Sequence, residues 1–213
     1  MAALITSVMG NTDKVVEYIR ECNSLGIEVL KPDINKSYSK FSVEGHNIRF
    51  GLAAVKNVGV NIIENIINER NTNGKFLDFS DLAKRLDSKD TNKRVIESLI
   101  KCGAFDEISE NRASLMAAYE NVLDSISMDR KKNLQGQISL FDAFSSSEEQ
   151  TLQQDNSIPK LPEYQEREKL SLEKEVLGMY VSGHPLSEVK DILTKNTSID
   201  NGKLNSLKEY EKT

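Results

Sequence analysis

The sequence predicts a mainly α-helical protein with one short β-hairpin near the N-terminus and a disordered linker before its C-terminal helices. Three observations lead to this prediction. Apolar residues recur at spacings of three and four along most of the first ~130 residues, which is the period of an amphipathic helix. Gly, Asn, Asp and Ser separate these stretches at short intervals, as in compact helical units. Strict alternation of apolar and polar residues occurs around residues 41–50.

The N-terminal part of the chain combines one helix with short extended segments. A helix is predicted over residues 12–25, with Cys22 on its apolar stripe and Gly26 as its stop. We interpret Cys22 as a core residue rather than a reactive thiol. Residues 27–30 are predicted to be extended, and residues 41–50 to form the hairpin. His46 lies at the tip of its turn.

From Leu52 onward the pattern is helical. The predicted helices cover residues 61–70, 79–86, 92–100, 113–126, 163–179 and 187–193. Residues 145–162 are polar, without periodicity, and end in two prolines, which is typical of a disordered linker. The helices before this linker are short and closely connected, which predicts a compact helical unit.

Composition excludes several classes of function. The chain has 213 residues, a formal net charge of −5, two cysteines and two histidines. These four potential ligands share no metal-binding spacing, so we predict no metal site, no disulfide framework and a reduced, cytoplasmic setting. No apolar run approaches the ~18 residues of a membrane span, so we predict no membrane partner.

The negative charge is concentrated in the C-terminal half. Residues 49–112 carry 11 basic and 10 acidic side chains, whereas residues 113–213 carry 12 and 17. A protein that coats nucleic acid through positive charge is therefore disfavoured. Binding through backbone amides is still compatible with this composition.

One candidate for such binding is the turn at residues 55–59, which separates a short apolar helix from an Ile-rich helix. Small residues in a helix-hairpin-helix turn let a phosphate approach the backbone, and the first amides of the next helix bind it. Gly59 and Val58 fit this pattern, and Asn57, which tolerates left-handed geometry, replaces a glycine. The candidate DNA-binding residues are Lys56, Asn57, Val58, Gly59 and Val60. An ordinary helix–helix turn explains this stretch equally well.

A second turn of this kind makes a tandem arrangement of helix-hairpin-helix motifs the favoured prediction. Gly103 follows Gly59 by about 44 residues, and such motifs often occur in pairs that contact the two strands of a duplex. The candidate DNA-binding residues here are Lys101, Cys102, Gly103 and Ala104. Lys93, Arg94 and Arg112 could widen the basic patch, or they could simply form a solvated helix face.

A third candidate is the stretch from Gln137 to Phe141, directly before the predicted linker. Its residues are Gln137, Ile138, Ser139, Leu140 and Phe141. An amide followed by a Leu-Phe pair can bind a pocketed protein, because each apolar side chain contributes about 1.5–3 kcal/mol when it is buried. The alternative is a helical turn that packs on the preceding helices.

Several stretches resemble the catalytic alpha subunits of bacterial DNA polymerase III, the C-family replicative polymerases. The resemblance runs in order from residue 1 to about residue 190. Its first part rests on Met1-Ala-Ala-Leu, Thr12-Asp-Lys-Val, Glu21-Cys, Gly26-Ile and Pro32-Asp-Ile-Asn35. The rest rests on Ile48-Arg-Phe-Gly-Leu-Ala-Ala-Val-Lys-Asn-Val-Gly59, Asn92-Lys-Arg94, Gly103-Ala-Phe-Asp106 and Glu173-Lys-Glu-Val-Leu-Gly-Met-Tyr-Val-Ser-Gly-His-Pro-Leu186.

The resemblance implies an internal fragment with five parts. These are the end of the fingers domain (1–50), a tandem helix-hairpin-helix domain that binds duplex DNA (51–133), an internal sliding-clamp-binding motif (134–144), a flexible linker (145–162) and a helical connection toward a missing oligonucleotide-binding fold (163–213). It implies the duplex DNA backbone, the sliding clamp (the beta subunit) and other polymerase III holoenzyme subunits as partners. The polymerase's Mg²⁺ would belong to the absent palm domain, so we expect no cofactor and no catalytic residue in this chain.

Two other functions stay open at this point. The chain could be a protein-interaction scaffold in which both hairpins are only structural. A hydrolase using Cys102 and His184 is disfavoured, because the sequence offers no oxyanion element or third catalytic group.

Overall fold

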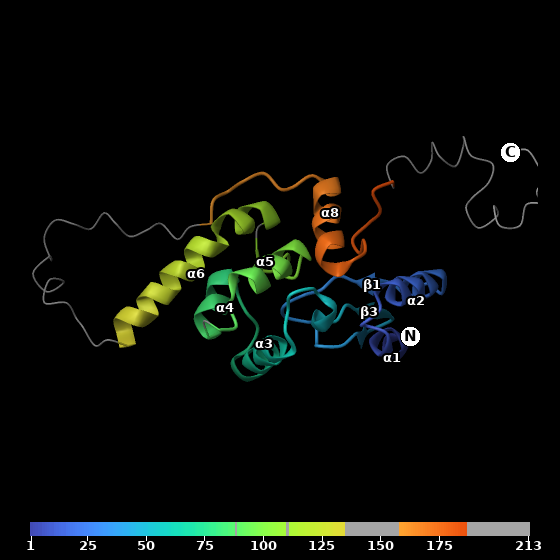
Figure 1. The fold of residues 1–213 in the computed structure, drawn as a ribbon, viewed down its shortest axis with the longest axis horizontal. Helices are drawn as coiled ribbons and strands as arrows, with labels where there is room; N and C mark the ends of the chain where they lie inside the picture. The colour runs from blue at the N-terminus through green and yellow to red at the C-terminus, as the bar shows by residue number, and fades with distance from the viewer. Residues whose placement is uncertain (88, 110, 135–157, 187–213) are drawn as a thin grey trace, which may run out of the picture. The chain divides into compact units, whose positions relative to one another are not determined.

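The computed structural model describes residues 1–87, 89–109, 111–134 and 158–186. The chain divides into two units, Met1–Ser182 and Gly183–Thr213. Within the described residues the first unit is mainly helical with one small sheet, which confirms the predicted fold class (Figure 1). The predicted clamp-binding residues 137–141, residues 145–157 of the predicted linker and the predicted helix at 187–193 lie outside the described residues.

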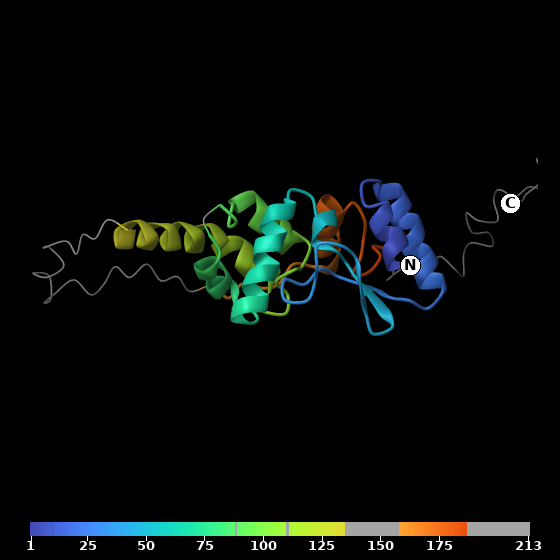
Figure 2. The same ribbon diagram turned by 90° about the horizontal axis from the view of Figure 1, so that it is seen from below.

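The N-terminal part pairs two helices with a three-stranded sheet. Helix α1 (Ala2–Ser7) packs beside α2 (Thr12–Ser24), as Figure 2 shows. Helix α2 begins after Asn11, whose side chain accepts a hydrogen bond from the Lys14 amide at 3.1 Å. Helix α2 and its termination near Gly26 were predicted, but α1 was not, because six residues are too few to show a helical period.

The sheet confirms the predicted extended segment and hairpin. Strands β2 (Ser42–Glu44) and β3 (Asn47–Arg49) are antiparallel, and β1 (Val29–Leu30) pairs in parallel with the other edge of β3. His46 is exposed in the turn. Cys22 is fully buried, as expected for a core residue.

Short helices of the middle region surround an apolar core. They are the 3₁₀ helix η1 (Leu52–Ala54) and the α-helices α3 (Val60–Asn73), α4 (Phe79–Arg85), α5 (Lys93–Lys101) and α6 (Arg112–Leu134). Phe79 and Phe105 meet edge to face at a centroid distance of 5.6 Å. Both rings are buried, so they join α4 to the turn that follows α5.

Helix α8 (Glu166–Leu177) returns to this helical region and lies beside α5 (Figure 1). It begins three residues later than predicted, because Glu163 has another function. The Glu163 carboxylate accepts hydrogen bonds from the amides of Arg112 and Ala113 and so caps the start of α6. The Leu161 carbonyl also accepts a hydrogen bond from Asn111, at 2.8 Å. Leu161 and Glu163 therefore contact the start of α6, and Ile158 packs against the core. This differs from the prediction that residues 158–162 belong to a flexible linker.

Candidate nucleic-acid interface

The first hairpin has the backbone geometry that its sequence predicts. Asn57 has a φ of +66°, which confirms that this asparagine takes the left-handed position expected of a glycine. Gly59 has an extended conformation and is the N-cap of α3. Lys56, Asn57, Gly59 and Val60 are exposed, whereas Val58 is buried beneath them. The turn therefore presents its backbone to solvent and anchors itself through Val58.

The N-terminus of α3 is open to a ligand. No side chain caps it, and the N–H groups of residues 59–62 have no acceptor among the described residues. Such amides carry the positive end of the helix dipole and favour anions. A Cβ added to Gly59 would meet no other atom within 4 Å, so the approach to these amides is unobstructed.

The second hairpin uses its amides differently. Gly103, with a φ of +77°, ends α5 in a Schellman motif. The amides of Cys102, Gly103 and Ala104 donate to the carbonyls of residues 98, 100 and 99, at 3.1, 2.9 and 3.0 Å. All three residues are also buried. This differs from the expectation that these N–H groups face DNA phosphates, because the end of α5 already satisfies them.

The two hairpins are joined to each other. The Asn57 amide group donates to the Ser98 hydroxyl at 3.1 Å, and this hydroxyl donates to the Arg94 carbonyl at 3.0 Å. Asn57 thus has two functions, the left-handed turn and a link to α5. Helix α5, which leads into the second hairpin, therefore holds the first hairpin in place through Ser98.

Both hairpin lysines have partners on α8. The Lys56 ammonium donates to the Glu175 carbonyl at 2.9 Å, and the Lys56 amide donates to the Val176 carbonyl at 2.9 Å. The Lys101 ammonium forms ion pairs of 2.7 Å with Glu97 and with Glu175. Burial lowers the pKa of Lys101, but these hydrogen-bonded carboxylates outweigh it, so the pKa lies above its ordinary value.

Arg112 belongs to a buried network, not to a basic surface. Its side chain is 4% exposed and bonds to Asp106 at 2.9 Å and to Glu173 at 3.1 Å. Glu173 on α8 is fully buried and also accepts hydrogen bonds from the amides of Val181 and Ser182. The idea that Arg112 widens a DNA-binding patch is therefore wrong.

The charges of this network stabilise one another. Burial alone would lower the pKa of Arg112, but Asp106 and Glu173 reverse this effect and raise the pKa. Burial would raise the pKa of Asp106, yet hydrogen bonds from Arg112 and Lys31 hold the pKa below its usual range. The network thus connects the second hairpin, α6 and α8 through charged hydrogen bonds.

Cys102 has the environment of a core residue. It is fully buried, and burial raises its pKa to about 12. A thiol with this pKa is protonated at neutral pH and is a poor nucleophile. Among the described residues, no group of three or more His, Cys, Asp or Glu side chains is placed to hold a metal ion.

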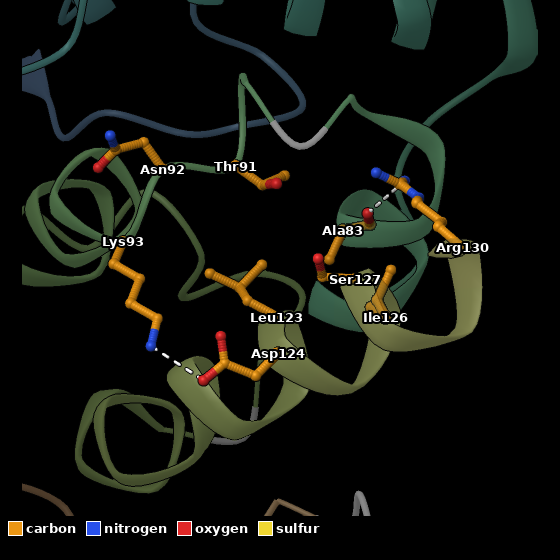
Figure 3. A pocket seen from close by; sticks show the side chains of 9 residues that line it. All are labelled: Ala83, Thr91, Asn92, Lys93, Leu123, Asp124, Ile126, Ser127 and Arg130. Carbon is orange, nitrogen blue, oxygen red and sulfur yellow. Dashed lines mark hydrogen bonds and ion pairs between the residues drawn. The ribbon is translucent and has the colours of Figure 1, made fainter. Parts of the chain in front are cut away.

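A cavity of about 400 Å³ lies between α4, the start of α5 and α6 (Figure 3). Lys93 points toward Asp124 (Figure 3) and forms an ion pair with it at 3.0 Å, and it also pairs with Glu120. Arg130 donates to the carbonyls of Ala83, Lys84 and Leu86 and so closes the end of α4. The two cationic side chains that line this cavity, Lys93 and Arg130, are therefore already bonded to groups of the protein itself.

Sequence reasoning missed the part played by α8. Glu173 and Glu175 touch the Arg and Lys residues of the second hairpin, but they follow it by more than 60 residues in the chain. One signal was present, since Glu173 lies on the apolar stripe of Leu170, Val176 and Leu177. A charged residue in such a stripe indicates a buried ionic partner.

Comparison with known proteins agrees with this architecture. A family model described as a helix-hairpin-helix motif matches residues 26–115. The described part of the chain contains no helix that is both long and apolar enough to cross a membrane.

Three relatives illustrate the similarity over nearly the whole chain. DNA polymerase III subunit alpha of Mycobacterium tuberculosis is 43% identical over 91% of the chain and 16% of that protein. The subunits named alike from Borreliella burgdorferi and Thermus aquaticus are 40% and 41% identical, over 94% and 87% of the chain. The chain spans 17% and 14% of those two proteins. On this evidence the chain belongs to the family of bacterial DNA polymerase III alpha subunits and corresponds to about one sixth of the length of these relatives.

Proposed function

We propose that this chain is the part of a replicative DNA polymerase that holds duplex DNA by its backbone. The observation that carries the proposal is the exposed, uncapped N-terminus of α3, presented by the Asn57–Gly59 turn. Amides bind phosphate oxygens without reading bases, so the binding is independent of sequence. The match to a helix-hairpin-helix model supports this assignment.

The expected affinity for duplex DNA is low. The middle of the chain is nearly neutral, and the lysines next to both hairpins are already bonded to α8. Few phosphates are therefore neutralised, and the salt dependence is shallow for a DNA-binding protein. The second hairpin supports the first through Asn57 and Ser98, and its amides are not phosphate ligands in this conformation.

Gly59→Val tests the proposed phosphate site. The backbone of Gly59, with a φ of −76°, accepts valine, but the new side chain would stand where a phosphate approaches α3. We expect about tenfold weaker binding to a duplex, since one charge-assisted hydrogen bond contributes roughly 1.5 kcal/mol or more. Fluorescence anisotropy with a labelled duplex at low salt measures the change.

Gly10→Val is the matched control. An added Cβ at Gly10 also meets nothing within 4 Å, and this glycine lies in the connection between α1 and α2. Thermal unfolding checks that both variants are folded. Equal affinities of the two variants would rule out the α3 N-terminus as the binding site.

We also propose that Gln137–Phe141 tethers the chain to a sliding clamp. The support is the sequence itself, a glutamine followed at a short distance by an adjacent Leu-Phe pair. In this proposal Gln137 bonds at the rim of a pocket on the clamp, and Leu140 and Phe141 fill the pocket. Tethering of this kind would raise the effective concentration of the chain at the duplex and so compensate for its low affinity for DNA.

The double variant Leu140→Ala, Phe141→Ala is expected to abolish clamp binding and to leave duplex binding unchanged. Loss of both apolar side chains removes roughly 3–6 kcal/mol if each is fully buried. Surface plasmon resonance on an immobilised clamp measures the first effect, and Ser139→Ala is the control within the same motif. An unchanged clamp affinity in the double variant would refute the assignment.

A further inference from the structure

Two lysines from different hairpins meet at the last turn of α8. Glu175 accepts a hydrogen bond from Lys56 with its backbone carbonyl, at 2.9 Å. Its carboxylate forms an ion pair with Lys101, at 2.7 Å. Lys56 precedes the open N-terminus of α3 by three residues, so this meeting point lies next to the proposed phosphate site.

The group that the lysines contact is chemically similar to a phosphodiester. It combines one negative charge with several oxygen acceptors, and it lies at the end of a helix, where the dipole adds partial negative charge. Glu175 thus supplies to Lys101 what a DNA backbone phosphate would supply.

The contact is also easily broken. The Glu175 side chain is 57% exposed, and ion pairs with such exposure contribute little net stability. The Lys101 side chain is only 16% exposed and has a second partner in Glu97, so it stays in place when Glu175 moves away. An incoming phosphate would therefore compete with Glu175 for a lysine that is already held in position.

We propose that Glu175 is an internal competitor for DNA, which occupies Lys101 in the absence of a duplex and gives way to a backbone phosphate. This inference rests on the proposed duplex binding by the first hairpin and adds its regulation. The second hairpin then contributes a side-chain ammonium to the duplex, although its amides are used by α5.

Glu175→Gln tests the competition, because it removes the charge and keeps the size of the side chain. We expect about two- to fivefold tighter duplex binding at low salt, as for the release of one exposed ion pair.

Glu166→Gln is the matched control. Glu166 lies on the first turn of the same helix and pairs with Lys169, at 3.4 Å, so its replacement changes the net charge equally without touching a hairpin. If Glu175→Gln binds no more tightly than Glu166→Gln, the competition does not exist. If it binds more weakly than the wild type, Glu175 orients Lys101 for DNA instead of withholding it, and the proposal is also wrong.

Lys101→Gln gives an independent measurement. With competition, this substitution weakens duplex binding by a larger factor in the Glu175→Gln background than in the wild type. Equal factors in both backgrounds would contradict the proposal. Absence of duplex binding in both the wild type and Glu175→Gln would refute the proposed duplex binding itself, and not only the competition by Glu175.

Discussion

Replacing Gly103 by alanine is expected to lower the free energy of unfolding by about 3 kcal/mol or more. Two effects combine at this position. The φ of +77° is unfavourable for a residue with a Cβ, at a cost of roughly 1–2 kcal/mol. The new Cβ would also collide with the Arg112 guanidinium and come within 2.8 Å of an Asp106 carboxylate oxygen. The collision would displace a buried ion pair, which adds to the cost.

Gly45→Ala separates these two effects. Gly45 has a φ of +63°, but an added Cβ meets nothing within 4 Å there. We therefore expect only the backbone cost of roughly 1–2 kcal/mol from this control. Urea denaturation followed by circular dichroism measures both values. A Gly103→Ala variant no less stable than Gly45→Ala would show that the contact with Arg112 does not constrain the hairpin.

Glu173→Gln is expected to cost about 3 kcal/mol of stability. Glu173 is fully buried, and its hydrogen-bond partners among the described residues all donate to it: Arg112, Ser182 and the Val181 amide. A glutamine places an NH₂ donor among these donors and leaves part of the Arg112 charge uncompensated. Removal of one partner from a buried ion pair typically costs 3–5 kcal/mol, and Asp106 still pairs with Arg112 here.

Glu166→Gln again serves as the control, because Glu166 is exposed and its replacement is expected to cost less than about 0.5 kcal/mol. The same urea denaturation compares the two variants. A loss below roughly 1 kcal/mol in Glu173→Gln would mean that packing of α8, and not its buried charge, holds this helix on the hairpins.

Local patterns were sufficient for the described α-helices other than α1, for the β-hairpin and for the left-handed turn at Asn57. Each of these depends on residues close in the chain. Apolar residues at helical spacing bury one face of α3 and α5, and Asn at a position that normally requires Gly predicts a positive φ. The open N-terminus of α3 could be predicted for the same reason, since it follows directly from Gly59 at the N-cap.

The second hairpin could not be predicted in the same way. A glycine after an apolar helix fits two structures, a turn that binds phosphate and a Schellman motif that satisfies its own helix. The choice depends on Arg112 and Glu173, which lie 61 residues apart in sequence and meet beside Gly103. The spacing of residues within one helix gives no information on such a long-range contact. The burial of Cys102–Ala104 could therefore not be predicted from the sequence.

The same contacts account for two of the acidic residues in the C-terminal half of the chain. Acidic residues 173 and 175 are not merely part of a solvated tail, since they neutralise the basic groups of the second hairpin. The proposed phosphate site at the start of α3 consists of backbone amides, which formal charge does not count. The protein can therefore be acidic overall and still offer a site for a phosphate.

The central claim is that the chain holds the duplex backbone through few phosphates and without reading sequence. The most direct measurement is the affinity of the wild-type protein for duplexes of unrelated sequence as the salt concentration is raised. We expect one common affinity, falling with a log–log slope of about −1 to −2, as for one or two phosphates. A preference for one sequence, an affinity that is unchanged by salt, or no binding at the lowest salt concentration would contradict this account.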